Sequence, residues 1–176
     1  MEGCSYMFVL EVVTVLIVMN AVLFIHEIGH AIPVLLRNKK ARVEIYLGPR
    51  NKEQKLELRL GRLTCYLTIA FSGLCRVANS DELPSATPKQ NLLFSACGPI
   101  ASLIVFILFL YLSSIIPGIP GNIFNSAAFM SFSVFLFTAI PITYPSFFKN
   151  LGGHKSDGWY ILKNIKEIKN QAKTIA

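Results

Sequence analysis

The sequence predicts an α-helical polytopic membrane protein with three spanning helices and a membrane-associated β-hairpin or sheet after the first. The chain has 176 residues, 53% of them hydrophobic, and its mean hydropathy is +0.51. The apolar residues form long blocks, and the 17 basic residues avoid them: none lies in 1–36 or 90–148, eleven lie in 37–89 and six in 149–176. Between the first two blocks, apolar and charged residues alternate with period two, which indicates β-strands.

The placement of the basic residues also predicts topology, because loops rich in lysine and arginine stay on the cytoplasmic side. Three spans put both basic segments on one side. We therefore expect a multi-pass integral protein with its N-terminus outside and its C-terminus cytoplasmic, in a prokaryotic cell membrane. The net charge of +7 does not indicate a nucleic-acid partner, because the lysines flank hydrophobic spans without interleaved exposed aromatic residues.

The first span is expected over about 8–36. It has no basic region before it and no small-residue cleavage site, so it should remain attached rather than act as a signal peptide. Residues 12–36 alone would form about 37 Å of helix, more than the roughly 30 Å that a bilayer core requires. Pro33 is expected to kink the end of this helix.

A β-type segment is expected over 41–78. Residues 43–47 and 56–60 alternate apolar and charged side chains around a turn signal at 48–51, which predicts a β-hairpin, and 63–69 can add a third strand. The apolar run 63–78 is short and partly polar. As a span it would separate the two basic segments, so we expect a strand or re-entrant segment there instead.

The rest of the chain supplies two more spans and a tail. A polar linker at 79–91 precedes a span over about 92–112, an uncharged turn at 113–122 and a span over about 123–145. The tail 159–176 is expected to be an amphipathic helix that lies on an anionic inner leaflet or packs on the protein. The four cysteines lack CxxC spacing and predict neither a disulfide framework nor a cysteine zinc site; they are Cys4, Cys65, Cys75 and Cys97.

Chemistry is concentrated in the first span, where His26 and His30 are four residues apart on one helical face with Glu27 beside them. This pattern predicts two imidazole ligands for one zinc ion. Polar residues buried in a spanning helix are functional by default because their burial is costly. A catalytic zinc site usually needs a third protein ligand. Asp81 is expected to be a solvated turn residue, His154 a loop residue, and Asp157 either a ligand or the N-cap of the tail helix.

Four segments resemble the site-2 protease family of intramembrane zinc metalloproteases: His-Glu-Ile-Gly-His-Ala at 26–31, Leu-Gly-Pro at 47–49, Ala-Cys-Gly-Pro-Ile-Ala-Ser at 96–102 and Ser-Asp-Gly at 156–158. Together they extend over the whole chain. The resemblance implies a single membrane-embedded metalloprotease domain over 1–176, a three-helix site-2-protease-like core, and one Zn²⁺ with Asp157 as third ligand. The chain departs from the family at 140–141, where Ile-Pro replaces the frequent Asn-Pro.

The expected function is therefore that of an intramembrane zinc endopeptidase, which cleaves membrane-anchored protein substrates in the lipid bilayer with Glu27 as general base. Val43 and Ile45 are expected to hold an unwound substrate by strand addition. Gly98 and Ser102 form a small-xxx-small surface, which is expected to pack against another helix, and the resemblance suggests the alternative that they bind substrate. The alternative is a catalytically silent membrane scaffold or regulator that binds transmembrane helices. A zincin acting on farnesylated proteins is less favoured, because no later glutamate stands in a matching helical motif. No oligomeric state is predicted.

Overall fold

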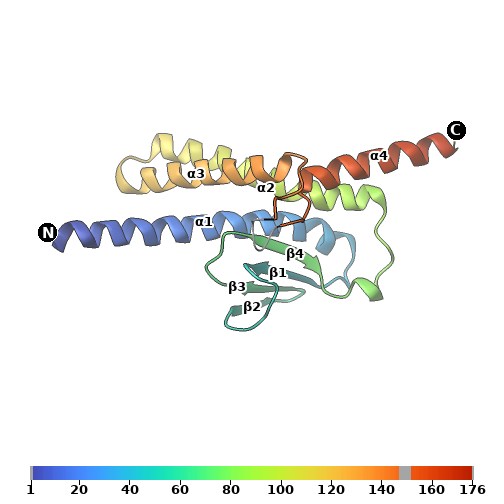
Figure 1. Cartoon of the computed structure of the whole chain (residues 1–176), viewed down its shortest axis with the longest axis horizontal. Helices are drawn as coiled ribbons and strands as arrows, with labels where there is room; N and C mark the ends of the chain where they lie inside the picture. Colours follow the sequence, from blue (N-terminus) through green and yellow to red (C-terminus); the bar gives the residue numbers. More distant parts are fainter. Residues whose placement is uncertain (1, 147–151, 176) are drawn as a thin grey trace.

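The computed structural model describes residues 2–146 and 152–175, with side chains for 9–146 and 152–174. The side chain of Cys4 therefore lies outside the described part, whereas Cys65, Cys75 and Cys97 are free thiols. The elements follow one another along the chain in this order (Figure 1): α1 (Glu2–Arg37), β1 (Val43–Leu47), β2 (Leu56–Leu60), β3 (Leu63–Leu67), β4 (Gly73–Val77), a 3₁₀ turn (Ser80–Glu82), α2 (Pro88–Ile115), α3 (Gly118–Ala139) and α4 (Asp157–Ile175).

Three of the helices are long and apolar enough to cross a membrane: Val9–Arg37, Pro88–Ile115 and Gly118–Ala139. The predicted polytopic helical fold is confirmed, but two boundaries were wrong. Only residues 116 and 117 separate α2 from α3, so the turn expected at 113–122 is mostly helical. The prolines there do not prevent this, because a proline is tolerated in the first turn of a helix. Conversely, α3 ends at Ala139 rather than near 145, since Pro141 disfavours helical geometry in the residue before it.

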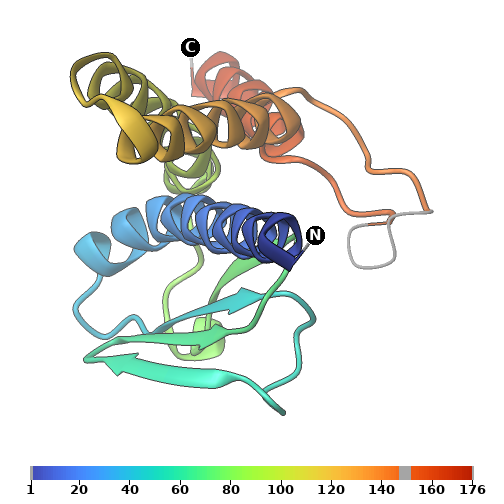
Figure 2. The same ribbon diagram turned by 90° about the vertical axis from the view of Figure 1, so that its left-hand side faces the viewer.

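The elements form layers, with α1 between the sheet on one side and the α2–α3 pair on the other (Figure 2). A small apolar core fills the space between α1 and the sheet. Its members are buried side chains from the end of α1 and from three strands: Ala31, Val34, Ala41, Val43, Ile45, Cys65 and Cys75. This contact holds the sheet against the half of α1 that carries the histidines.

The strand order in the sheet is β2-β3-β1-β4, which corrects the predicted hairpin. The strands at 43–47 and 56–60 both exist, but they do not pair with each other. The hairpin is instead β2–β3, joined by the two residues Gly61 and Arg62, and β3 then pairs with β1 in parallel. Because β1 pairs with β4 on its other side, it is an internal strand and all five of its residues are buried. The expected strand within 63–69 is confirmed.

The face of β1 turned away from α1 carries a compact ion network. Glu44 accepts hydrogen bonds from Tyr46 Oη at 2.8 Å, Lys52 Nζ at 3.0 Å and Arg76 Nη2 at 2.6 Å. Burial would raise the pKa of the Glu44 carboxyl, but the hydrogen bonds from these three side chains outweigh it and lower the pKa. The network explains how a charged residue occupies a fully paired central strand.

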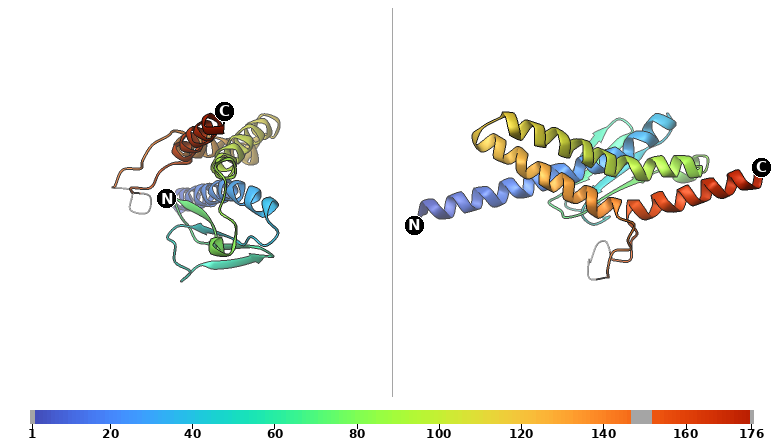
Figure 3. Two further views of the ribbon diagram at one scale, coloured as in Figure 1. Left: turned by 90° about the vertical axis from the view of Figure 1, so that its right-hand side faces the viewer. Right: turned by 90° about the horizontal axis from the view of Figure 1, so that it is seen from above.

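The C-terminal helix α4 starts beside the histidines in the C-terminal half of α1 and runs along the N-terminal half of α2, so that the two chain ends lie far apart (Figure 3). It begins at Asp157, two residues before the start predicted for the tail. The isoleucines of its apolar face, Ile161, Ile165 and Ile168, are half-buried, whereas residues 169–174 are exposed. Of the two alternatives for the tail, packing on the protein therefore describes its first half.

Candidate metal centre

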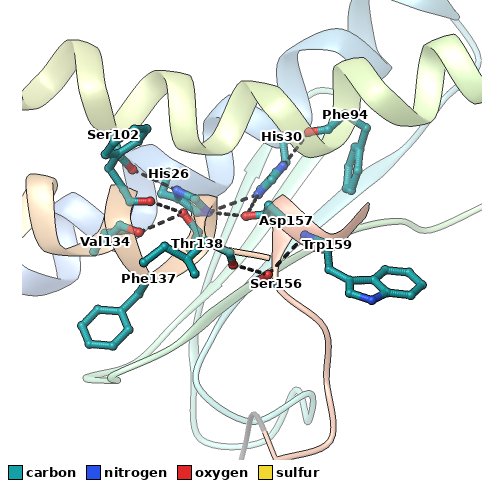
Figure 4. Close-up of polar contacts among 12 residues, drawn as sticks. His26, His30, Phe94, Ser102, Val134, Phe137, Thr138, Ser156, Asp157 and Trp159 are labelled. Carbon is teal, nitrogen blue, oxygen red and sulfur yellow. Dashed lines mark hydrogen bonds and ion pairs between the residues drawn. The ribbon is translucent and has the colours of Figure 1, made fainter. Parts of the chain in front are cut away.

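His26, His30 and Asp157 converge at the place where α4 begins (Figure 4). His26 Nε2 lies 3.2 Å from His30 Nε2, and Asp157 Oδ2 lies 3.3 Å from the first of these nitrogens and 3.4 Å from the second. Both histidines are buried, with exposed fractions of 3% and 4%. Three potential ligand atoms thus form a nearly equilateral triangle in the interior of the protein.

The spacing of these atoms fits a zinc ion. In tetrahedral coordination with ligand distances of about 2.0–2.1 Å, neighbouring ligand atoms are about 3.3–3.4 Å apart. The donor set of two imidazoles and one carboxylate also suits zinc, and three protein ligands leave one position for water or substrate. The residues that the structure brings together therefore have the composition and spacing of a catalytic zinc site.

Each imidazole is oriented by a partner on α2. His30 Nδ1 lies 2.7 Å from the carbonyl oxygen of Phe94, which can only accept, so Nδ1 carries the proton and Nε2 keeps its lone pair. His26 Nδ1 lies 2.9 Å from Ser102 Oγ, which can accept in the same way. A Cβ at Gly98 would collide with the His30 ring, so the glycine permits the close approach of α2 to this ligand. These contacts turn both Nε2 atoms toward Asp157.

Asp157 reaches the histidines through a strap, which we define as residues 140–146 and 152–156. Its two segments run antiparallel: Tyr144 N–H donates to His154 O at 2.9 Å, and Ser156 N–H donates to Ile142 O at 3.0 Å. The strap folds back from the end of α3 and so places the start of α4 next to α1. Pro141 and Asp157 are far apart in the sequence, and this irregular connection folds inward so that Asp157 can lie near His26.

The N-terminus of α4 is capped by Ser156, which leaves the Asp157 carboxylate free to face the imidazoles. Ser156 Oγ accepts from Trp159 N–H at 3.3 Å and from Ile142 N–H at 3.0 Å. Asp157 Oδ2 faces the Nε2 atoms of both imidazoles at 3.3 and 3.4 Å. A carboxylate in this position can complete the set of ligands once it is ionised, as a metal ligand must be.

Glu27 lies between the metal ligands and β4. Only 5% of it is exposed, and a Cβ at Gly73 would collide with its carboxylate, so the absence of a side chain at Gly73 makes room for it. The backbone of Cys75 lies within hydrogen-bonding reach of the same carboxylate. Glu27 is thus held next to the three candidate ligands and is not a member of that cluster.

A cavity of about 1230 Å³ opens onto these side chains. Glu27, His26, His30 and Asp157 all line it. Its walls come from seven parts of the chain: α1, the turn 48–50 after β1, β4 with residues 71–72 before it, the end of α3, the strap, the start of α4 and the start of α2. The space is large enough to hold a peptide segment in addition to water.

The substrate contacts expected from the sequence need correction. Val43 and Ile45 are 1% and 0% exposed on the internal strand β1, so neither can add a substrate strand. Gly98 and Ser102 are absent from the cavity lining and lie behind the imidazoles instead. His154 lines the cavity from the strap, while Asp81 is exposed in the 3₁₀ turn away from the centre.

Several residues of the site were missed by sequence reasoning. The Phe94 carbonyl is a backbone group, and no side-chain pattern identifies it. Asn20 accepts from Ala70 N–H at 2.9 Å and so ties the loop before β4 to α1. A polar side chain six residues before His26 in an apolar helix was the available signal for Asn20.

Comparison with known proteins adds one finding. The model of Peptidase family M50 matches residues 14–174, nearly the whole chain, and the matched region includes α2, α3, the sheet and every side chain of the candidate centre. No protein with a curated description matches the chain.

Proposed function

This chain belongs to peptidase family M50, the site-2 protease family, and we propose that it is a zinc-dependent endopeptidase that cleaves membrane-anchored proteins in or near their transmembrane segments. The family is one of membrane metalloproteases. The zinc-dependent activity is proposed because His26, His30 and Asp157 lie together beside Glu27. Both histidines and Glu27 belong to a helix that is apolar enough to span a membrane. Burying ionisable side chains inside a membrane is energetically unfavourable, so such a cluster is expected to have a chemical function.

The proposed mechanism assigns the proton transfers to Glu27. Zinc held by the three ligands would supply Lewis-acid polarisation of the scissile carbonyl and lower the pKa of water at the site to about 7. A carboxylate oxygen of Glu27, which lines the cavity, takes a proton from that water and passes it to the leaving amine nitrogen. Ser102 and the Phe94 carbonyl keep both imidazoles in the ligating orientation throughout.

A substrate helix must unwind before cleavage, because its amides are hidden in intrahelical hydrogen bonds, and β4 offers the edge that can hold it. Gly48 N–H donates to Ser72 O and Ala78 N–H donates to Arg42 O, each at 2.8 Å, so the even-numbered residues of β4 bond toward β1. The backbone groups of Gly73 therefore point to the open edge, beside Glu27. Strand addition at β4 replaces the addition at β1 that the sequence suggested.

The proposed orientation places the centre in the cytoplasmic half of the membrane. Arg37 ends α1 eleven residues after His26, about 16 Å along the helix, and the basic residues of the sheet follow it. Water then enters from the cytoplasmic side. A reporter fused at the C-terminus should be found inside the cell, and its appearance outside would refute this topology.

Zinc content and cleavage of a model transmembrane substrate in bicelles test the proposal together. Glu27→Gln should keep zinc and lose cleavage, because the base is removed and the ligands are not. Asp157→Asn should lose both, while Asp81→Asn, which changes an exposed aspartate far from the centre, should lose neither. Bound zinc without Glu27-dependent cleavage of any substrate tried would contradict the proposal and favour the silent scaffold.

A further inference from the structure

The part of the cavity lined by α2 and α4, which we call the arm, includes two polar side chains that have no assigned role. Ser95 on α2 is 5% exposed and Asn164 on α4 is 4% exposed, and both line the cavity. Ser95 follows Phe94, whose carbonyl orients His30. Asn164 is seven residues after Asp157, two helical turns along the same face of α4. Both side chains therefore lie next to the candidate metal centre, on the two helices that contribute to it.

The hydrogen-bonding capacity of these side chains is not used up within the protein. Asn164 Nδ2 donates to Tyr160 O at 2.7 Å, but in the described part of the chain its Oδ1 has no partner, and neither does Ser95 Oγ. No described side-chain nitrogen or oxygen that is sealed from solvent lacks a partner. The unpaired atoms of Ser95 and Asn164 are therefore accessible to solvent, and both residues line the cavity. Water can pair with these atoms in the free protein, so an occupant that displaces the water must offer hydrogen-bonding groups of its own.

We propose that Ser95 and Asn164 form a subsite for the substrate main chain on the cytoplasmic side of the scissile bond. This inference rests on the proposed function. An amide and a hydroxyl each donate and accept without charge, so they complement the N–H and C=O groups of an extended peptide whatever its side chains are. The subsite would hold different substrates by the atoms that all of them share.

The course of α4 gives the subsite its direction. From Asp157 the helix runs away from α3 and beyond the start of α2, toward the end of the molecule where α1 also ends (Figure 1). Lys163 and Glu167 also line the arm, the first next to Asn164 and the second one helical turn after Lys163, and form an ion pair 3.6 Å apart on the surface of α4. A peptide that leaves the metal centre along this arm therefore passes from buried uncharged groups to exposed charged ones, as a chain emerging from a membrane does.

Binding by the full chain carrying Glu27→Gln tests the subsite without cleavage. The probe is a fluorescent model transmembrane peptide with its native-length cytoplasmic flank, titrated in bicelles. Asn164→Ala and Ser95→Ala, each added to Glu27→Gln, should raise Kd at least fivefold while zinc content stays unchanged. Asn170→Ala, an exposed asparagine on the same helix, should leave Kd unchanged. Unchanged Kd in both subsite variants would overturn the inference.

A series of peptides with one N-methylated amide each tests the contact with the main chain. At one flank position, N-methylation should weaken binding at least fivefold in the parent and have no further effect with Asn164→Ala, because both changes remove the same hydrogen bond. Additive effects at every position would overturn the inference. The inference would also be overturned if Asn164→Ala and Ser95→Ala slowed cleavage without changing Kd, because that result would indicate that the two side chains conduct water to the centre. If the intact enzyme cleaves nothing while this binding pattern holds, the proposed function fails and the subsite stands.

Discussion

Ser102→Ala isolates the effect of imidazole orientation on zinc binding. The two ligands differ in how they are oriented, since His30 bonds to a backbone carbonyl that no side-chain substitution removes, whereas His26 bonds to a hydroxyl. Ser102 is 1% exposed, so water has no space to replace the lost oxygen. In the variant, the proton of His26 can move from Nδ1 to Nε2, and the ring then no longer presents a lone pair to the metal.

The magnitude follows from the contact that is lost. A hydrogen bond of this kind contributes about 0.5–1.5 kcal/mol, and leaving a buried N–H unpaired costs about 1–3 kcal/mol. Since tenfold in affinity corresponds to about 1.4 kcal/mol, zinc affinity should fall by about 10- to 100-fold, the range typical for partners of metal-bound histidines.

The assay is competition for zinc against a chromophoric chelator, with thermal unfolding of the zinc-free protein measured in parallel. Ser131→Ala is the matched control, because Ser131 is also fully buried in a spanning helix and its Oγ donates to Ala127 O at 2.7 Å, away from the centre. It should lose stability and keep its zinc affinity. Zinc affinity of Ser102→Ala within twofold of wild type would refute the tautomer argument.

Two further predictions concern the sheet. Asn20→Leu leaves the buried Ala70 N–H without its hydrogen-bond partner and should lower the free energy of unfolding by about 1–2 kcal/mol, measured by thermal unfolding. Asn125→Leu, at an exposed position on α3, should have no such effect. Equal effects of the two substitutions would contradict the proposed contact between α1 and the loop before β4. Glu44→Gln should cost about 1–2 kcal/mol at pH 7. The folded-state pKa of Glu44 is lowered, so its contribution is full above the unfolded pKa of about 4.3 and is lost as pH falls through the folded pKa. The difference between the wild-type and variant melting temperatures should therefore shrink as pH falls below about 4.3, and a constant difference would contradict this.

The apolar blocks and charge distribution predicted the helices well, because long uninterrupted hydrophobic runs have few alternative structures. Strand pairing was harder. The alternation at 43–47 identified a strand. The turn residues Gly48 and Pro49 suggested a hairpin with 56–60, although the two-residue connection Gly61–Arg62 between alternating runs is the stronger indicator of a hairpin. Period-two alternation also indicates a half-buried strand. It could not reveal that Glu44 is buried through an ion network formed by residues distant in sequence.

The same limit applies to the candidate centre. His26, Glu27 and His30 could be recognised because one helix fixes their geometry, whereas the arrangement of Ser102 depends on how α2 packs on α1. Spacing alone gave Ser102 a packing or substrate role, and the structure places its hydroxyl on a ligand. Residues whose function depends on contacts between elements carry little local signal.

Asp157 was expected to be either a metal ligand or the N-cap of the tail helix, and in the structure its neighbour Ser156 is the cap. Ser156 takes the capping position and ties the strap to α4, so capping makes no demand on the aspartate. Gly158 packs where a Cβ would collide with Ala139 O at the end of α3, which fixes how closely α4 can begin to that helix. In Ser-Asp-Gly, Ser156 ends the strap and Gly158 lets α4 pack closely against the end of α3. Between them, the Asp157 side chain faces the histidines. The aspartate reaches the metal ligands because its neighbours supply the structural functions that a helix start requires.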